Sequence, residues 1–290
     1  MKRPSATLAG LGAVLASQIS VNLGAACAKL LFAEINPLGV TALRVVFAAC
    51  LLAMLRRPWR RVPPGATRPA LILYGTMLAG MNLFIYQAFL RIPIGIAVGI
   101  EVTGPLVIVL LNSRRPRDFW WLALVAAGLA LLLPLHVHSK LNPVGIAFAL
   151  GAALCWALYI VSGKRVAGKL GADAVSWGMA VAALIVAPLG ISVLHFSALR
   201  PWELGLALAV ALLSSAVPYS LEMEAMKRLS SRAFSILLSA APAIAALAGF
   251  VVLGESLTLL QWGAMLCIMA ASAGSAMSVK SPVPPESFEV

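Results

Sequence analysis

The stretch LAGLGAVLASQISVNLGAACAKLLF, residues 8–32, carries one charged side chain, Lys29, in 25 positions. A helix needs about 20 apolar residues to cross the hydrocarbon core of a bilayer. Strands of outer-membrane barrels alternate apolar and polar residues, whereas this run is continuously apolar. It is also too long for the apolar region of a signal peptide and lacks a convincing cleavage site. The run therefore predicts a first membrane helix.

Nine further apolar runs follow along the 290 residues. The chain is 61% hydrophobic and only 11% charged, with a mean hydropathy of +0.97, which excludes a soluble enzyme, a disordered protein and a disulfide scaffold. We predict an all-α integral membrane protein that crosses the lipid bilayer with ten transmembrane helices. Besides 8–32, the expected spans are about 37–55, 70–90, 94–111, 119–135, 143–162, 174–194, 204–226, 232–252 and 258–278.

Lysine and arginine give the chain a formal net charge of +12. They lie in short connections between the apolar runs, a pattern that orients membrane proteins and does not indicate nucleic-acid binding. With the N-terminus inside, three basic residues fall in outer connections: Arg91, Lys140 and Arg200. Lys29 and Arg44 lie within runs, which leaves 17 of the 22 on the inner side. The sequence therefore predicts that both ends, including a tail at 279–290, are cytoplasmic.

An internal repeat relates the two halves of the chain. A shift of 137 residues places AFLRIPIGIAVGIEVTGP, residues 88–105, on AMKRLSSRAFSILLSAAP, residues 225–242. Each half has five expected spans, an odd number, so the halves must cross the membrane in opposite directions. Inverted repeats are typical of secondary transporters, whose substrate site lies between the halves. We predict two inverted five-helix repeats, at 8–135 and 143–278.

The same shift matches two prolines, Pro105 and Pro242, inside apolar runs. Proline removes a backbone donor and kinks a helix. Matched kinks suit alternating access, so both prolines are candidate hinges. The alternative is a pair of static kinks, since proline is common in membrane helices.

Three ionisable residues are predicted at similar depth in the outer half of the membrane: Lys29, Arg44 and Glu101. Placing such a residue in the membrane costs roughly 2.5–3.5 kcal/mol, so each indicates function. A zwitterionic amino acid needs a cation for its carboxylate, which Arg44 or Lys29 can supply, and an acceptor for its ammonium, which Glu101 can supply. Two alternatives remain: a structural ion pair between the second and fourth spans, and a Lys29 that reaches to the outer surface.

Glu222 lies toward the cytoplasmic end of the eighth span, within PYSLEMEAMKRL. A carboxylate at this depth can exchange protons, and Glu101 is a second candidate for proton coupling. Glu222 can equally pair with Lys227 or Arg228 near the membrane surface.

Other polar and aromatic residues complete a predicted cavity. The candidate substrate-binding residues, besides Arg44 and Glu101, are Asn22, Asn82, Tyr86, Trp156 and Tyr219. Aromatic residues near span ends also form interfacial belts, and an asparagine between helices can serve as a helix–helix contact.

The sequence contains no catalytic or nucleotide-binding motif. It lacks GxSxG, HExxH and a P-loop, so ATP does not drive the protein directly and no enzyme activity, metal or cofactor is predicted. The four cysteines lie in apolar runs and form no CxxC pair. A secondary carrier or a channel remains, and the sequence does not indicate its oligomeric state.

Six segments resemble bacterial threonine/homoserine exporters of the drug/metabolite transporter superfamily, which carry EamA-type domains. The segments are GVTALR (39–44), IPIGIAVGIEVTGPL (92–106), NSRRPRDF (112–119), YIVSGKR (159–165), PYSLEMEAMKRL (218–229) and LGESLTLLQ (253–261). The resemblance implies ten helices in two inverted repeats in the inner membrane, and export of small amino acids such as threonine and homoserine in exchange for protons. Substrates vary widely within the superfamily, so efflux of another metabolite or a drug is the alternative. A membrane-embedded enzyme is disfavoured because the outer connections carry few catalytic residue types.

Overall fold

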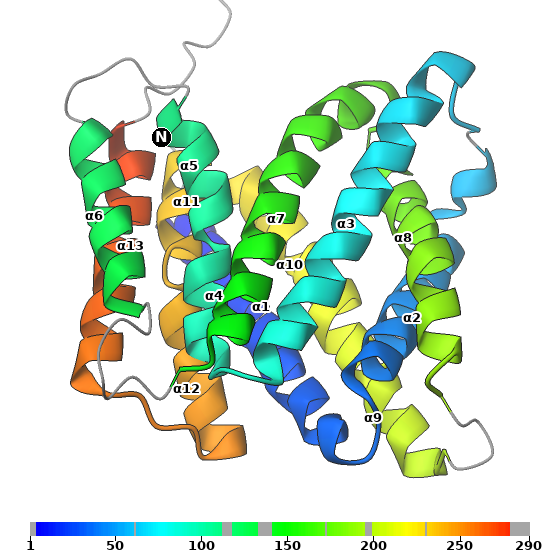
Figure 1. Cartoon of the computed structure of the whole chain (residues 1–290). Coiled ribbons are helices and arrows are strands. Elements are labelled where there is room, and N and C mark those ends of the chain that lie inside the picture. The colour runs from blue at the N-terminus through cyan, green and yellow to red at the C-terminus, as the bar shows by residue number, and fades with distance from the viewer. Residues whose placement is uncertain are drawn as a thin grey trace, which may run out of the picture.

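The computed structural model of the chain describes residues 4–60, 62–111, 118–132, 141–171, 173–194, 199–229 and 231–278. Every regular element in these ranges is a helix (Figure 1). The predicted all-α class is therefore confirmed.

The described part of the first half forms six α-helices: α1 (Pro4–Leu30), α2 (Pro37–Arg56), α3 (Arg68–Phe89), α4 (Ile94–Glu101), α5 (Thr103–Leu111) and α6 (Asp118–Leu132). The second half forms α7 (Pro143–Leu170), α8 (Asp173–Ile191), α9 (Pro201–Ala211), α10 (Val217–Arg228), α11 (Ser231–Leu238), α12 (Ala241–Leu253) and α13 (Leu259–Ser278). A π-helical segment, Leu212–Ala216, joins α9 to α10.

Within the described ranges, seven helical segments are long and apolar enough to cross a membrane: Leu8–Ala33, Pro37–Arg56, Gly65–Phe89, Pro143–Gly163, Asp173–Ile191, Ala233–Leu253 and Leu259–Met277. Three shorter apolar helices, Ile94–Ile108, Phe119–Leu132 and Pro201–Ser215, lie within or beside three other predicted spans. The structure thus supports a multi-pass helical membrane protein, while the count of ten remains a prediction.

Asparagine followed by proline starts two of the long helices. The Asn36 side chain accepts a hydrogen bond from the Leu38 N–H at 3.0 Å, and Pro37 is the first residue of α2. At α7, the Asn142 side chain accepts from the Val144 N–H at 2.9 Å. Both residues favour a helix start. The asparagine side chain accepts from a free backbone N–H of the first turn, and proline at the first position lacks an N–H that would have no partner in the helix.

Helix α4 is separated from α5 at Val102, and α11 from α12 at Ser239–Ala240. Each break lies just before a matched proline. Pro105 has no N–H to donate to the Glu101 carbonyl, and Pro242 has none for the Leu238 carbonyl, so the regular ladder is interrupted there. The Thr103 hydroxyl bonds instead to the Ile100 carbonyl at 2.6 Å. The hinge role of Pro105 and Pro242 stays a prediction.

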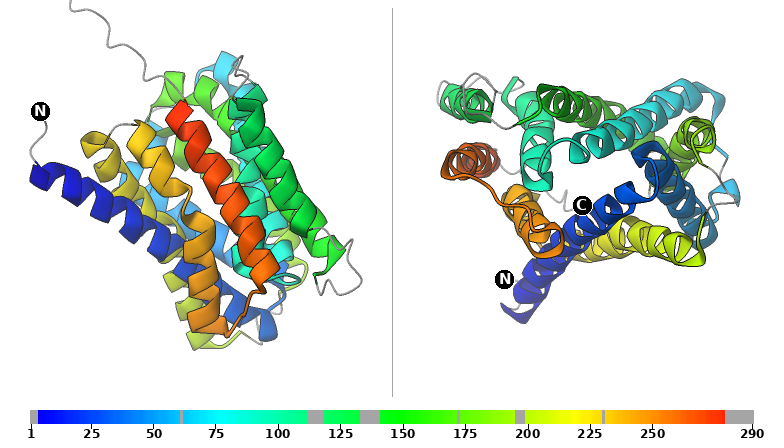
Figure 2. Two further views of the ribbon diagram at one scale, coloured as in Figure 1. Left: turned by 90° about the vertical axis from the view of Figure 1, so that its left-hand side faces the viewer. Right: turned by 60° about the horizontal axis from the view of Figure 1, so that its bottom comes forward.

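The helices form a bundle in which each half packs against the other (Figures 1 and 2). Helix α3 packs against α7 and α8, α2 against α8, α1 against α10 and α12, and α6 against α13. Helix α1 begins and α13 ends at the same end of the bundle (Figure 1), which we call the near end. The far end carries the connections that precede α2, α4 and α13.

Glycine at position 104 lets α5 approach α7. A Cβ atom on Gly104 would overlap the carbonyl oxygen of Ala153, a backbone atom that cannot turn aside. We expect Gly104→Ala to lower the free energy of unfolding by about 3 kcal/mol, because overpacking forces backbone shifts. Thermal unfolding in detergent, followed by tryptophan fluorescence, measures this. Gly263→Ala is the matched control, since a Cβ there has no neighbour within 4 Å; equal melting temperatures for the two variants would contradict the packing.

Candidate functional site

A cavity of about 360 Å³ lies between helices from both halves of the chain. Helices α1, α2, α3 and α4 contribute from the first half, and α7, α8, α10, α11, α12 and the π-helical segment from the second. Most of its lining is apolar, with polar groups at a few places, as is usual for small-molecule sites. Its polar and ionisable lining residues are Gln18, Asn22, Arg44, Asn82, Tyr86, Glu101, Trp156, Tyr159, Ser214, Ser215 and Glu222.

Arg44 enters the cavity from α2 and lies over the ring of Tyr86, which comes from α3. The guanidinium carbon is 4.8 Å from the ring centroid, a cation–π contact. The Nε atom of Arg44 and the hydroxyl of Tyr86 are buried, and neither has a hydrogen-bond partner among the described residues. Buried polar groups in folded proteins are nearly always paired. These two donors are therefore well suited to an anionic group that enters the cavity.

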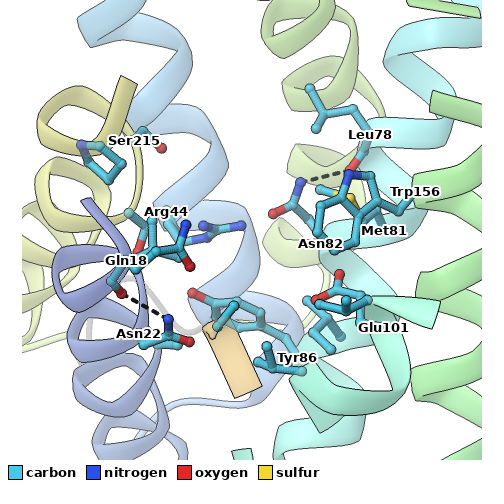
Figure 3. A pocket seen from close by; sticks show the side chains of 18 of the residues that line it. Gln18, Asn22, Arg44, Leu78, Met81, Asn82, Tyr86, Glu101, Trp156 and Ser215 are labelled. Atoms are coloured by element: carbon cyan, nitrogen blue, oxygen red, sulfur yellow. Dashed lines mark hydrogen bonds between the residues drawn. The ribbon is translucent and has the colours of Figure 1, made fainter. Parts of the chain in front are cut away.

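Glu101 is the last residue of α4, next to the break at Val102. Figure 3 shows its carboxylate on the opposite wall of the cavity from Arg44. No residue in the described ranges forms a hydrogen bond or an ion pair with this carboxylate. The structure thus places a cation and a carboxylate on facing walls without joining them, and the alternative of a structural ion pair between the second and fourth spans is not found among the described residues.

Two asparagines add neutral polar groups on either side. Asn22 donates to the Gln18 carbonyl at 2.8 Å, and Asn82 donates to the Leu78 carbonyl at 2.7 Å (Figure 3). Each bond holds the amide against its own helix and leaves the amide oxygen available to a ligand. Gln18 lies one helical turn before Asn22, so both side chains reach the same face of α1.

The π-helical segment contributes Ser214 and Ser215 to the wall. Its backbone is irregular because Pro218, which follows, cannot donate to the carbonyl of Ser214. Ser20 on α1 compensates in part, since its hydroxyl donates to the Leu213 carbonyl at 2.7 Å. Single π-helical turns often occur at functional sites.

Glu222 on α10 also lines the cavity, and it accepts a hydrogen bond from the Ser17 hydroxyl at 2.9 Å. The alternative raised by the sequence, a pair with Lys227 or Arg228, stays open for Lys227, whose side chain lies outside the described residues. Nearby, the Tyr74 and Tyr159 hydroxyls lie 2.8 Å apart and their rings are stacked.

Lys29 does not line the cavity. Its Nζ atom lies 2.7 Å from Glu255 Oε1 and 3.1 Å from the Ile92 carbonyl oxygen. It is therefore neither directed into the cavity nor simply extended toward the surface, the two roles expected from sequence. Of the two candidate cations, only Arg44 faces the cavity.

Seven of the predicted substrate- or proton-binding residues line this one cavity: Asn22, Arg44, Asn82, Tyr86, Glu101, Trp156 and Glu222. The side chain of Tyr219 lies outside the described residues. Pro105 and Pro242 do not line the cavity, but Val102 and Ala241, at the two breaks, do. Sequence reasoning missed Gln18, Ser214 and Ser215, although the spacing of Gln18 and Asn22 was a usable signal. Among the described side chains, no three metal-ligating residues cluster.

Comparison with known proteins identifies the family. The threonine/homoserine exporter RhtA of Escherichia coli (strain K12) is 44% identical over 269 residues, which is 92% of this chain and 91% of that protein. The chain belongs to the EamA-like transporter family. The model of this family matches residues 143–277. The RhtA protein of Salmonella typhimurium (strain SL1344) is likewise 44% identical, over the same shares of both chains.

Membership in the EamA-like family confirms that the chain is a membrane transporter and not an enzyme. One solved crystal structure has a TM-score of 0.60 and covers 95% of this chain and 97% of its own. At 21% identity, that likeness shows a shared fold alone. The cavity described above is the candidate site for a small solute.

Proposed function

We propose that this protein exports small amino acids such as threonine and homoserine across the bacterial inner membrane in exchange for protons. One observation carries the proposal: Arg44 and Glu101 face each other across the cavity, and neither is paired with the other. Two unpaired opposite charges in an apolar site fit a ligand that carries both charges itself. The names of the curated relatives support the choice of solute.

A zwitterionic amino acid matches the two walls. Its carboxylate would accept from Arg44 Nε and the Tyr86 hydroxyl, the two buried donors without partners. Its ammonium would donate to Glu101. A hydroxyl on a short side chain would then meet the amides of Asn22 and Asn82. Pairing of charged groups in a site that excludes water is strong, which suits binding of a solute that is itself well hydrated.

Helix packing supports the two inverted repeats. The shift of 137 residues carries α1 onto α7, α2 onto α8, α3 onto α9 and α10, α4 onto α11, α5 onto α12, and α6 onto α13. The contacts between helices follow the same correspondence. The α1–α10 contact in one direction matches the α7–α3 contact in the other, and the α2–α9 contact matches the α8–α3 contact. The break at Val102 corresponds to the break at Ser239–Ala240. We therefore assign residues 8–135 and 143–278 to the two repeats of a ten-helix carrier.

The near end is assigned to the cytoplasm, with both chain ends and the tail at 279–290 on that side. The density of lysine and arginine in the near-end connections supports this orientation. Glu101 and Glu222 are the proposed proton carriers, since both carboxylates reach the cavity. Pro105 and Pro242 are the proposed hinges, because each follows a helix break that borders the cavity.

Transport into inside-out vesicles tests this function. Labelled threonine should accumulate in the vesicles, faster when their interior is more acidic than the medium, and excess homoserine should compete. Vesicles from cells that lack the protein are the control. Accumulation that ignores the proton gradient would contradict proton exchange. Failure of threonine to enter, with another metabolite entering instead, would contradict the choice of solute.

A further inference from the structure

A charged cluster at the far end joins three segments that are distant in sequence. Lys29 Nζ contacts Glu255 Oε1 at 2.7 Å and the Ile92 carbonyl at 3.1 Å. The second carboxylate oxygen of Glu255 accepts from the Ile94 N–H at 2.9 Å. The side chains of Lys29 and Glu255 therefore connect the end of α1, the start of α4 and the segment that follows α12.

These segments come from both repeats. Lys29 and Ile94 belong to the first repeat, and Glu255 to the second. The attachment is thus a bridge between the halves that must move relative to each other during transport.

Beside this cluster, α4 and α12 cross at close range. A Cβ atom on Gly95 would lie 2.6 Å from the Cβ of Ala246, so no larger residue fits at position 95 without a shift. Ile92, Ile94 and Ile96 are almost completely buried around the crossing. This packing lies at the start of α4, between the far end and the cavity-lining residues Val98 and Glu101.

The described residues of the near end do not form the equivalent crossing. Under the shift of 137 residues, α4 corresponds to α11 and α12 to α5. Among the described residues, α5 packs mainly against α7, and α11 against α13 and α1, with no comparable interface between α5 and α11. Among the described residues, the far end therefore carries this crossing and the ion pair, and the near end has no comparable crossing of α5 and α11.

We propose that the Lys29–Glu255 ion pair is the lock that holds the far end closed, and that it opens when the carrier releases its solute there. This inference rests on the proposed transport function. The pair is suited to reversible opening because the two side chains are 20% and 15% exposed. A fully buried pair would be very costly to separate, and a fully exposed one would hold little.

Labelling of a cavity cysteine tests the lock without any solute. The four native cysteines are replaced by alanine, and Met81→Cys places one thiol on the cavity wall (Figure 3). A membrane-impermeant maleimide is then added to intact cells, which expose the far end. We expect slow labelling with the lock intact and about tenfold faster labelling in Glu255→Gln, which removes the charge but keeps an oxygen for the Ile94 N–H.

Two further variants sharpen the result. Lys29→Gln should speed labelling as much as Glu255→Gln, and the double variant should add little, because both singles break the same pair. Glu34→Gln removes an exposed carboxylate at the same end and should change nothing.

Equal labelling in all variants, or rapid labelling of the parent, would overturn the lock. The maleimide applied to inside-out vesicles should label Met81→Cys at the same rate in every variant, which shows that the cavity is intact. Since neither measurement uses threonine, a failure of the lock is distinguishable from a failure of the proposed function.

Discussion

Replacing Glu101 with glutamine is expected to reduce threonine export about a hundredfold or more while leaving the protein folded. The substitution keeps the shape of the side chain but removes the charge that the ammonium would meet, and loss of one partner of a buried charged pair costs about 2–5 kcal/mol. It also removes one of two proposed proton carriers. Initial rates in inside-out vesicles, and resistance of overproducing cells to excess homoserine, measure the effect.

Glu34→Gln is the matched control for this prediction, because Glu34 is exposed and does not line the cavity. It should transport like the wild type. Full homoserine resistance in the Glu101→Gln variant would show that this carboxylate neither binds the solute nor carries the proton.

Replacing Arg44 with glutamine should weaken solute binding by a similar factor. The substitution removes both the positive charge and the planar group that lies over Tyr86. The Arg44→Lys variant should bind solute with an affinity between those of the wild type and Arg44→Gln. Lysine retains the positive charge but presents it as a point and does not stack on an aromatic ring as guanidinium does. The shift in melting temperature on adding homoserine measures binding directly: we expect a clear shift for the wild type, a smaller one for Arg44→Lys and none for Arg44→Gln.

The double variant Arg44→Gln/Glu101→Gln separates ligand binding from a structural role. If the two charges stabilise the fold through each other, each single variant melts early and the double variant recovers. If they serve a zwitterion, all three melt like the unliganded wild type and none responds to homoserine. Recovery of stability in the double variant would contradict our assignment.

Much of the site could be predicted because depth in a membrane follows from position in an apolar run. Arg44 and Glu101 were expected at similar depth, and the folded chain brings both to one cavity. The cost of placing a charge in hydrocarbon makes such residues conspicuous. Asn22 and Tyr86 were predicted in the same way, because they are uncharged polar residues inside apolar runs.

The partner of Lys29 could not be predicted. Glu255 lies 226 positions away, and the packing of α1 against α12 brings the two side chains together. An isolated run can show that a lysine needs a partner but not where that partner lies. The π-helical segment was likewise not predicted: Pro218 signals an interruption, but the contact of Ser20 with the Leu213 carbonyl comes from the packing of α1 against this segment.

Residue size at the α4–α12 crossing gives the carrier a preferred resting side. Gly95 and Ala246 allow the two backbones to touch there. The residues at the corresponding positions, 137 places away, are Arg232 and Val109, which are far bulkier. The equivalent crossing at the near end cannot pack as closely, so the inward-facing and outward-facing conformations of the protein without solute should differ in energy. We expect the protein without solute to populate mainly the conformation in which the binding site is open to the compartment from which it takes up solute.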